Sequence, residues 1–250
     1  MSIISSELRL YWAASRPEND TSAVGGAIDL DWRAVFTQMG ANDTIEAVSD
    51  NAGDTMNITV VGRSAAGAIV SETKALTGTT FISLDTLATV ERVLKASVAS
   101  DPAGIITVRR ATGDVTIGTI PVGERGFEIM FYNASSSPSG ALARFEKIFA
   151  YNANATLDLL GATVELDADP STVLTIRLED AQDDNNSAAN RLTEPTGNAG
   201  SWTGVGTAIA VTGTDLQAVS GIGLWVNQDL LTDNAPIRAS FDVIIAGSTV

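Results

Sequence analysis

Carboxylates are the most abundant side chains in this sequence that could do acid-base or metal chemistry, because histidine and cysteine are both absent. Without imidazole or thiol groups there is no Ser-His-Asp or Cys-His arrangement and no His-ligated zinc. Catalysis would have to come from carboxylates, Lys, Tyr or a borrowed cofactor. The sequence therefore predicts a protein that is not an enzyme, with no cofactor and no bound metal.

The strongest candidate for a cation site is a set of three alternating carboxylates. Glu165, Asp167 and Asp169 fall on one side of a predicted strand, since strand side chains alternate with a period of two. Their oxygens could bind Ca²⁺. The segment lacks the glycine and the terminal Glu of an EF-hand loop, so we interpret it as a solvated acidic face. The sequence leaves cation binding there open.

Paired carboxylates also raise the alternative of a glycosidase, in which two acids about 5 to 9 Å apart do acid and base work. That alternative requires a buried acid pair in a cleft, with at least one raised pKa. The sequence places no such pair. It also contains no Walker A sequence, no Gly-x-Ser-x-Gly elbow and no HExxH motif.

Three residues are candidates for an interface: Trp202, Trp12 and Asn185. Trp202 and Asn185 belong to a polar stretch from 179 to 206, and a loop of that length in a compact domain is functional or mobile. An exposed Trp202 could stack on a sugar ring or act as a protein-interface hot spot. Trp12 lies in a strand pattern, which favours a core or interface anchor.

The elements that must position these residues are short β-strands. Segments rich in Val, Ile, Thr and aromatic residues recur at roughly eight-to-twelve-residue spacing, with turn residues between them. This pattern predicts an all-β fold: an antiparallel, jelly-roll-like β-sandwich with a second, smaller β-sandwich module and very little helix. The predicted strands are 7–12, 26–32, 55–63, 68–74, 79–83, 91–98, 105–109, 115–120, 127–132, 143–151, 156–160, 162–166, 173–178, 207–211, 221–227 and 237–246.

The turn pattern also predicts how the chain is divided. Residues 51–126 form a compact run of hairpins, which we interpret as an inserted β module. Residues 1–50 and 127–250 then make a discontinuous main β-sandwich domain, whose termini should lie close together. Two consecutive domains are the alternative.

Composition restricts the partners. Thirty acidic residues against fifteen basic ones give a net charge of −15, which repels nucleic-acid phosphates and anionic lipids. The N-terminus lacks a basic region followed by an apolar one, and no stretch approaches eighteen apolar residues. We expect a chain made in the cytoplasm that binds neither nucleic acid nor membrane.

Several segments together resemble tailed-bacteriophage virion structural proteins. They are Ser5–Tyr11, Ala143–Phe149 with Asn152–Thr156, Trp225–Gln228 and Ala239–Val243, while Val60–Thr73 with Leu76–Thr79 is similar to β modules of phage head and tail proteins. The resemblance covers most of the chain and brings no catalytic residues with it.

The resemblance implies a non-enzymatic virion protein that binds and stabilises the capsid, as a decoration or cement protein. Its expected partners are the major capsid protein or other virion proteins, its expected state is a homo-oligomer, and its expected location is the virion. The alternative is a carbohydrate-binding module of a phage tail or fibre. Head or tail location, oligomer symmetry and the partner surface stay open.

Overall fold

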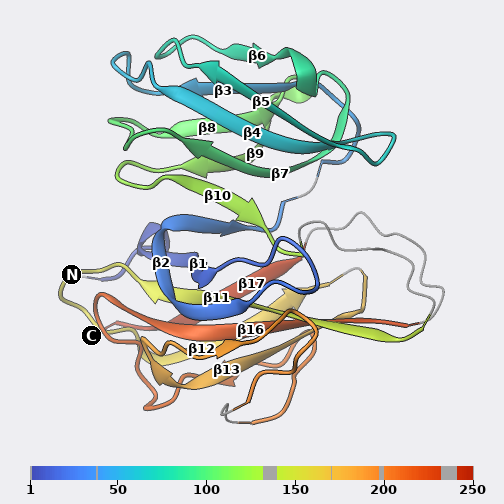
Figure 1. Cartoon of the computed structure of the whole chain (residues 1–250). Helices are drawn as coiled ribbons and strands as arrows, with labels where there is room; N and C mark the ends of the chain where they lie inside the picture. The colour runs from blue at the N-terminus through green and yellow to red at the C-terminus, as the bar shows by residue number, and fades with distance from the viewer. Residues whose placement is uncertain are drawn as a thin grey trace. The chain divides into compact units, whose positions relative to one another are not determined.

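A computed structural model describes residues 2–37, 39–131, 140–169, 171–196, 200–231 and 241–249 of the chain. Within these ranges the regular structure is strand, apart from three 3₁₀ turns: η1 (Ser5–Glu7), η2 (Asp85–Leu87) and η3 (Thr112–Asp114) (Figure 1). The predicted all-β, sandwich-like fold with very little helix is confirmed.

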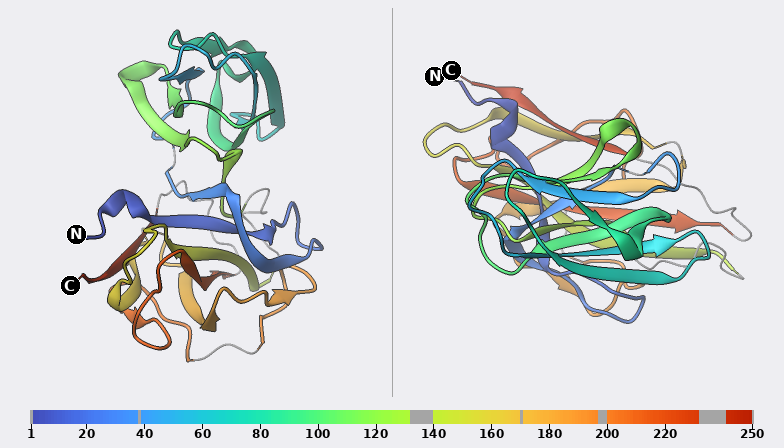
Figure 2. Two further views of the ribbon diagram at one scale, coloured as in Figure 1. Left: turned by 90° about the vertical axis from the view of Figure 1, so that its left-hand side faces the viewer. Right: turned by 90° about the horizontal axis from the view of Figure 1, so that it is seen from above.

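The chain divides into two compact units. Unit 1 contains residues 1–29 and 131–250, and unit 2 contains residues 30–130. The boundaries differ from the expected 50 and 127, because Ile45–Ser49 pairs with strands of unit 2 instead of belonging with the N-terminal strands. The two ends of the chain, both in unit 1, lie side by side in every view (Figure 2).

Unit 1 has two layers of strands. One sheet has the order β13-β16-β11-β1-β2, and the other has the order β15-β12-β17. The buried side chains of β12, at positions 162, 164 and 166, alternate with less buried ones, as expected of a strand with one face on a core. The strands are β1 (Leu8–Ser15), β2 (Val24–Val35), β11 (Leu142–Asn152), β12 (Leu160–Ala168), β13 (Leu174–Gln182), β14 (Ser187–Ala188), β15 (Ile209–Ala210), β16 (Ser220–Leu230) and β17 (Asp242–Ser248).

Unit 2 is a smaller sandwich. The second half of β2 continues the order β2-β10-β7-β4-β5, and a second sheet has the order β6-β3-β8-β9. Buried residues from both sheets, including Ile58, Val60, Ile106 and Phe127, form one apolar cluster. The strands are β3 (Ile45–Ser49), β4 (Asn57–Ser64), β5 (Ile69–Ala75), β6 (Ile82–Leu84), β7 (Val90–Val98), β8 (Ile106–Arg110), β9 (Val115–Ile120) and β10 (Gly126–Ile129).

Three details correct the predicted elements. Strand β3 was not predicted, although its alternating burial is regular, because Glu46 interrupts its apolar residues. The predicted strand at 156–160 is a turn in which the Asn154 side chain accepts hydrogen bonds from backbone N–H groups, and β12 begins only at Leu160. The pairing of β10 with β2 is parallel, against the antiparallel expectation. Residues 237–240 of the last predicted strand lie outside the described ranges.

Candidate functional site

Strand β11 carries charged side chains at positions where a core strand is normally apolar. Arg144, Glu146 and Lys147 are 1%, 0% and 0% exposed, in a strand that lies between β1 and β16. A buried charge is costly unless ion pairs and hydrogen bonds compensate it. By strand alternation Arg144 and Glu146 lie on one face of β11 and Lys147 on the other. Two separate polar clusters result.

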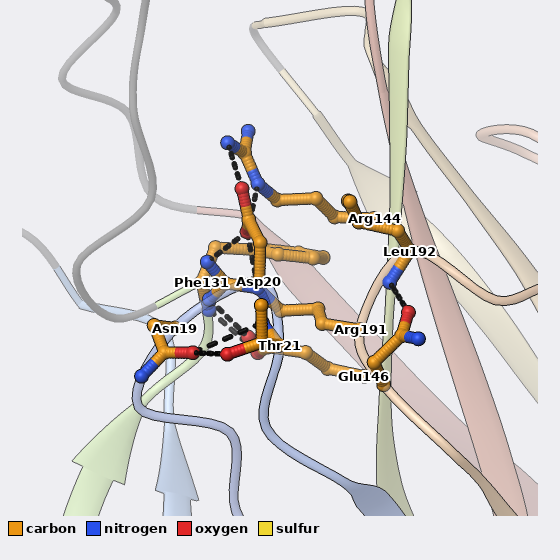
Figure 3. A network of polar contacts seen from close by, with 9 residues as sticks. Asn19, Asp20, Thr21, Phe131, Arg144, Glu146, Arg191 and Leu192 are labelled. Atoms are coloured by element: carbon orange, nitrogen blue, oxygen red, sulfur yellow. Dashed lines mark hydrogen bonds and ion pairs between the residues drawn. The ribbon is translucent and has the colours of Figure 1, made fainter.

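We call the first cluster the arginine clamp: Asp20, Arg144, Glu146 and Arg191 (Figure 3). Asp20 Oδ1 accepts hydrogen bonds from Arg144 Nε at 2.7 Å and Arg191 Nε at 3.0 Å, and Oδ2 accepts one from Arg144 Nη2 at 3.0 Å. Glu146 accepts from Arg191 Nη1 at 3.2 Å and from the Phe131 backbone N–H at 2.6 Å. Both arginines are therefore neutralised by carboxylates.

The clamp holds chain segments that are distant in sequence. Asp20 lies in the turn between β1 and β2, where Asn19 Oδ1 accepts the Thr21 backbone N–H at 2.9 Å. Arg191 follows β14, and its carbonyl accepts the Phe145 N–H at 2.8 Å. The pairing of β1 with β11 ends at Trp12 and Ile148. Beyond that point the backbone of Arg191 lies beside β11 instead of β1. The clamp thus fixes two loops against β11.

The electrostatics of Asp20 fit this holding role. Hydrogen bonding from Arg144 is the main reason that the Asp20 pKa is lowered from 3.8 to about 2; desolvation opposes the change, and Arg191 adds to it. The side chain of Asp20 is 33% exposed, whereas both arginines are buried. The carboxylate is stabilised in its charged form, which is the state that two buried guanidinium groups require.

We call the second group the lysine cluster: Lys147 of β11, Glu179 of β13 and Asp184 of the loop after β13. The side chains of these residues are 0%, 0% and 8% exposed. Lys147 Nζ pairs with Asp184 Oδ1 and lies 3.4 Å from Glu179 Oε1. It also donates to the carbonyl oxygens of Asn186, at 3.1 Å, and Gly26, at 3.4 Å.

Aromatic side chains enclose the lysine cluster. Glu179 Oε1 accepts the indole N–H of the fully buried Trp225 at 2.5 Å, and Glu179 Oε2 accepts from Asn186 Nδ2 at 2.9 Å. Lys147 Nζ lies 4.8 Å from the ring centroid of Phe149 and 5.7 Å from that of Trp225. The amine and both carboxylates are therefore held at fixed positions away from bulk water.

The three alternating carboxylates do not form a common face. Glu165 is half-buried and Asp167 exposed, but Asp169 is 7% exposed and lies beyond the end of β12, after a register shift. Asp169 accepts the backbone N–H groups of Ser171 at 3.0 Å and Leu174 at 2.8 Å. Its oxygens are thus used within a turn. No group of three or more acidic side chains placed to hold a metal ion occurs in the described ranges.

The three candidate interface residues have different positions. Trp12 is 1% exposed and is a core residue of unit 1, which is the core alternative of its predicted role as a core or interface anchor. Asn185 is exposed. Trp202 is half-buried: its ring packs on Phe145 at 5.4 Å between centroids, and its N–H donates to Glu194 Oε1 at 2.9 Å.

Neither cluster is among the sites predicted from the sequence. Residues 143–151 are predicted as an ordinary strand, although Arg144, Glu146 and Lys147 interrupt its apolar residues. That interruption is the available signal, since charges in the middle of a central strand need partners. Their charged partners lie 32 to 124 positions away, and no local spacing indicates them.

Comparison of the chain with family models, curated proteins and solved structures finds no match. Within the described part of the chain, no helix has the length and hydropathy needed to cross a membrane. Functional inference therefore depends on the geometry of the two units.

Proposed function

We propose that this chain is a non-enzymatic structural protein of a tailed-bacteriophage particle, which binds the capsid as a decoration or cement protein. The observation that carries the proposal is the open edge strand β5, which offers both backbone hydrogen-bonding groups and an exposed apolar side chain. The assignment to a virion rests on the sequence resemblance.

Strand β5 ends its sheet and is suited to pairing with a strand of another protein. Two backbone hydrogen bonds show which residues of β5 bond to β4: Leu76 N–H donates to Met56 O, and Ser64 N–H donates to Ala68 O. By the register of the pair, the backbone N–H and C=O groups of residues 70, 72 and 74 therefore point towards β4. The N–H and C=O groups of residues 69, 71, 73 and 75 then point to the outer edge. Exposed and half-buried side chains alternate along β5, and Ile69 is 43% exposed. Such an edge is a template for strand addition.

Unit 1 offers a comparable edge in β17, the end of its three-stranded sheet among the described residues. None of the side chains of β17 is fully buried, and Ile244 is 42% exposed. A single strand-pairing contact at such an edge is weak, but a symmetric shell repeats it many times. The repeated contacts together would hold a coat protein on the shell.

The charge distribution supports a protein partner. Salt bridges neutralise most of the arginines and lysines within the described ranges, including all three cations of the two clusters and the pairs Arg33–Glu124 and Arg109–Glu46. Acidic residues such as Glu18, Asp167 and Asp229 are exposed. The surface is therefore acidic, and it repels a packaged genome while leaving the edge strands available.

The test compares phage particles assembled with the wild-type chain, without it, and with Ile69→Lys. Wild-type chain should sediment with particles and slow their loss of infectivity on heating. Ile69→Lys should weaken both effects, since a lysine on an edge strand opposes pairing. Val122→Lys is the matched control, because Val122 is an exposed turn residue of the same unit.

Particles that lack the chain and resist heat as well as complete particles would overturn the proposal. Binding of the purified chain to a glycan array, abolished by Trp202→Ala, would instead favour the carbohydrate-binding alternative. The packing of Trp202 on Phe145 speaks for a structural role of that ring.

A further inference from the structure

We propose that Lys147 and Asp184 join covalently in the folded chain, forming an intramolecular amide (isopeptide) bond, with Glu179 as the group that moves the proton. The proposal is independent of the phage assignment. It starts from the burial of the lysine cluster and from the way its three side chains converge.

The convergence is fixed by Gly223 of β16, the strand between β11 and β13. A Cβ added at Gly223 would lie 2.6 Å from Asp184 Oδ2, 2.6 Å from Glu179 Cγ and 2.7 Å from Lys147 Cε. All three side chains therefore meet in the space that the missing Cβ leaves. A side chain at this position would displace at least one of them.

The loop that carries Asp184 is held in place by its neighbours. Asp183 accepts the Ser220 hydroxyl at 2.6 Å and the Gly221 N–H at 2.8 Å, at the start of β16. Its own N–H donates to the Gly221 carbonyl at 2.7 Å. Asp184 is thereby presented to Lys147 in one orientation, which lowers the entropic cost of a reaction between the two groups.

The hydrogen bonds around Lys147 orient it as a nucleophile. Transfer of one proton from the ammonium to Oδ2 of Asp184 gives an amine and a carboxylic acid with no change in net charge, and a neutral pair costs less to bury than a charged one. The amine has two N–H groups and one lone pair. The carbonyl oxygens of Asn186 and Gly26 accept the two N–H groups, which leaves the lone pair directed at Asp184.

The two oxygens of Asp184 have different surroundings that match the two products. Oδ1 accepts the Asn186 backbone N–H at 2.9 Å, which polarises the carbonyl and stabilises negative charge on this oxygen during attack. Oδ2 is buried and has no hydrogen-bond partner among the described residues. Oδ1 therefore corresponds to the amide oxygen, and Oδ2 to the oxygen that departs.

The reaction balances without a further reagent. The lone pair of Lys147 Nζ attacks Asp184 Cγ and forms the N–C bond. Glu179, whose Oε1 lies 3.4 Å from Nζ, takes a proton from the nitrogen and delivers it to Oδ2. The Cγ–Oδ2 bond breaks and one water molecule leaves. Glu179 returns to its starting state, and nothing is oxidised or reduced.

The test is the mass of the purified full chain after denaturation. The proposal predicts a mass lower than that of the sequence by one water. Trypsin does not cleave after an acylated lysine, so the peptide 145–177 should appear joined to the peptide 178–191. A wild-type chain with the full sequence mass, or with cleavage after Lys147 and the water lost elsewhere, would overturn the proposal.

Two variants test the roles of the groups. Glu179→Gln keeps the side-chain shape and should restore the full mass, with the circular dichroism of the wild type as the check on folding. Asp180→Asn is the matched control; Asp180 is the exposed neighbour of Glu179 in β13 and has no part in the lysine cluster, so this variant should keep the joined peptides. Joined peptides in folded Glu179→Gln would overturn the role of Glu179.

Discussion

Asp20 is the residue whose replacement tests the arginine clamp most directly, because it is the only carboxylate of the clamp that hydrogen-bonds to both arginines in the described structure. Asp20→Asn keeps the size of the side chain and removes its charge. The change removes the carboxylate that pairs with both buried guanidinium groups, whereas Glu146 still pairs with Arg191.

The expected loss of unfolding free energy in Asp20→Asn follows from two quantities. Lowering of the Asp20 pKa from 3.8 to about 2 corresponds to about 2 kcal/mol, which its one-third exposure reduces to about 1 to 2 kcal/mol. Removing one member of a buried ion pair costs about 3 to 5 kcal/mol, because the remaining charge is uncompensated. Asn retains a neutral acceptor, so we expect a loss of about 3 kcal/mol at pH 7, at the lower end of that range.

The pH dependence gives a second check. The folded pKa of Asp20 is below the unfolded value, so its stabilisation is complete above about pH 4 and is lost as the pH falls towards about 2. At pH 3 about half of the electrostatic contribution should be left. The difference between wild type and Asp20→Asn should therefore shrink as the pH falls from about 4 to 3, within the window that these two pKa values define.

The assay is urea unfolding followed by tryptophan fluorescence, since Trp12, Trp202 and Trp225 all belong to unit 1. Glu18→Gln is the matched control, because Glu18 is an exposed acid in the same turn as Asp20. It should change stability by less than about half a kcal/mol. Equal effects of the two variants at pH 7, or an Asp20→Asn effect that is the same at pH 3 and pH 7, would refute the reasoning.

Three further changes probe other parts of the two units. Gly223→Ala should destabilise unit 1 by about 1 to 3 kcal/mol, because its Cβ would overlap the lysine cluster; Gly204→Ala, with open space around it, should be neutral in the same urea titration. Ile58→Ala should cost unit 2 about 2 to 5 kcal/mol in thermal unfolding, because Ile58 is fully buried. The Asp54 carboxylate accepts hydrogen bonds from the backbone N–H groups of residues 103 and 104. Desolvation acts to raise its pKa, but the hydrogen bonds from Ser49 and from these two N–H groups outweigh desolvation, so the pKa is lowered. Wild-type unit 2 should therefore lose stability below about pH 4 more steeply than Asp54→Asn, measured by circular dichroism.

If the bond between Lys147 and Asp184 forms, it closes a loop between residues 37 positions apart. The loss of chain entropy in the unfolded state would then stabilise unit 1 by about 4 kcal/mol, by the same argument that applies to a disulfide. A chain without cysteine would thereby gain a covalent link that needs no oxidising environment.

The sequence by itself determined the fold class, because short alternating β-branched segments separated by turn residues have few other ways to bury their apolar faces. Strands such as β4 (Asn57–Ser64), β7 (Val90–Val98) and β16 (Ser220–Leu230) were predicted to within a few residues. Strand β3 was missed because its pattern is short and interrupted by Glu46, and only pairing with β6 and β8 makes it a strand.

Tertiary structure alone decided which polar residues come together. Glu165, Asp167 and Asp169 are close in sequence, yet Asp169 lies beyond the end of β12 and its oxygens are used in the following turn. Asp20 and Arg191 are 171 positions apart, yet they form the centre of the clamp. In the sequence Lys147 is one of three lysines, and nothing beside it indicates its partners. Its carboxylate and aromatic neighbours come together only when β11, β16 and β13 pair in one sheet. Local periodicity determines which face of a strand a side chain occupies, whereas strand order and loop placement determine what that face meets.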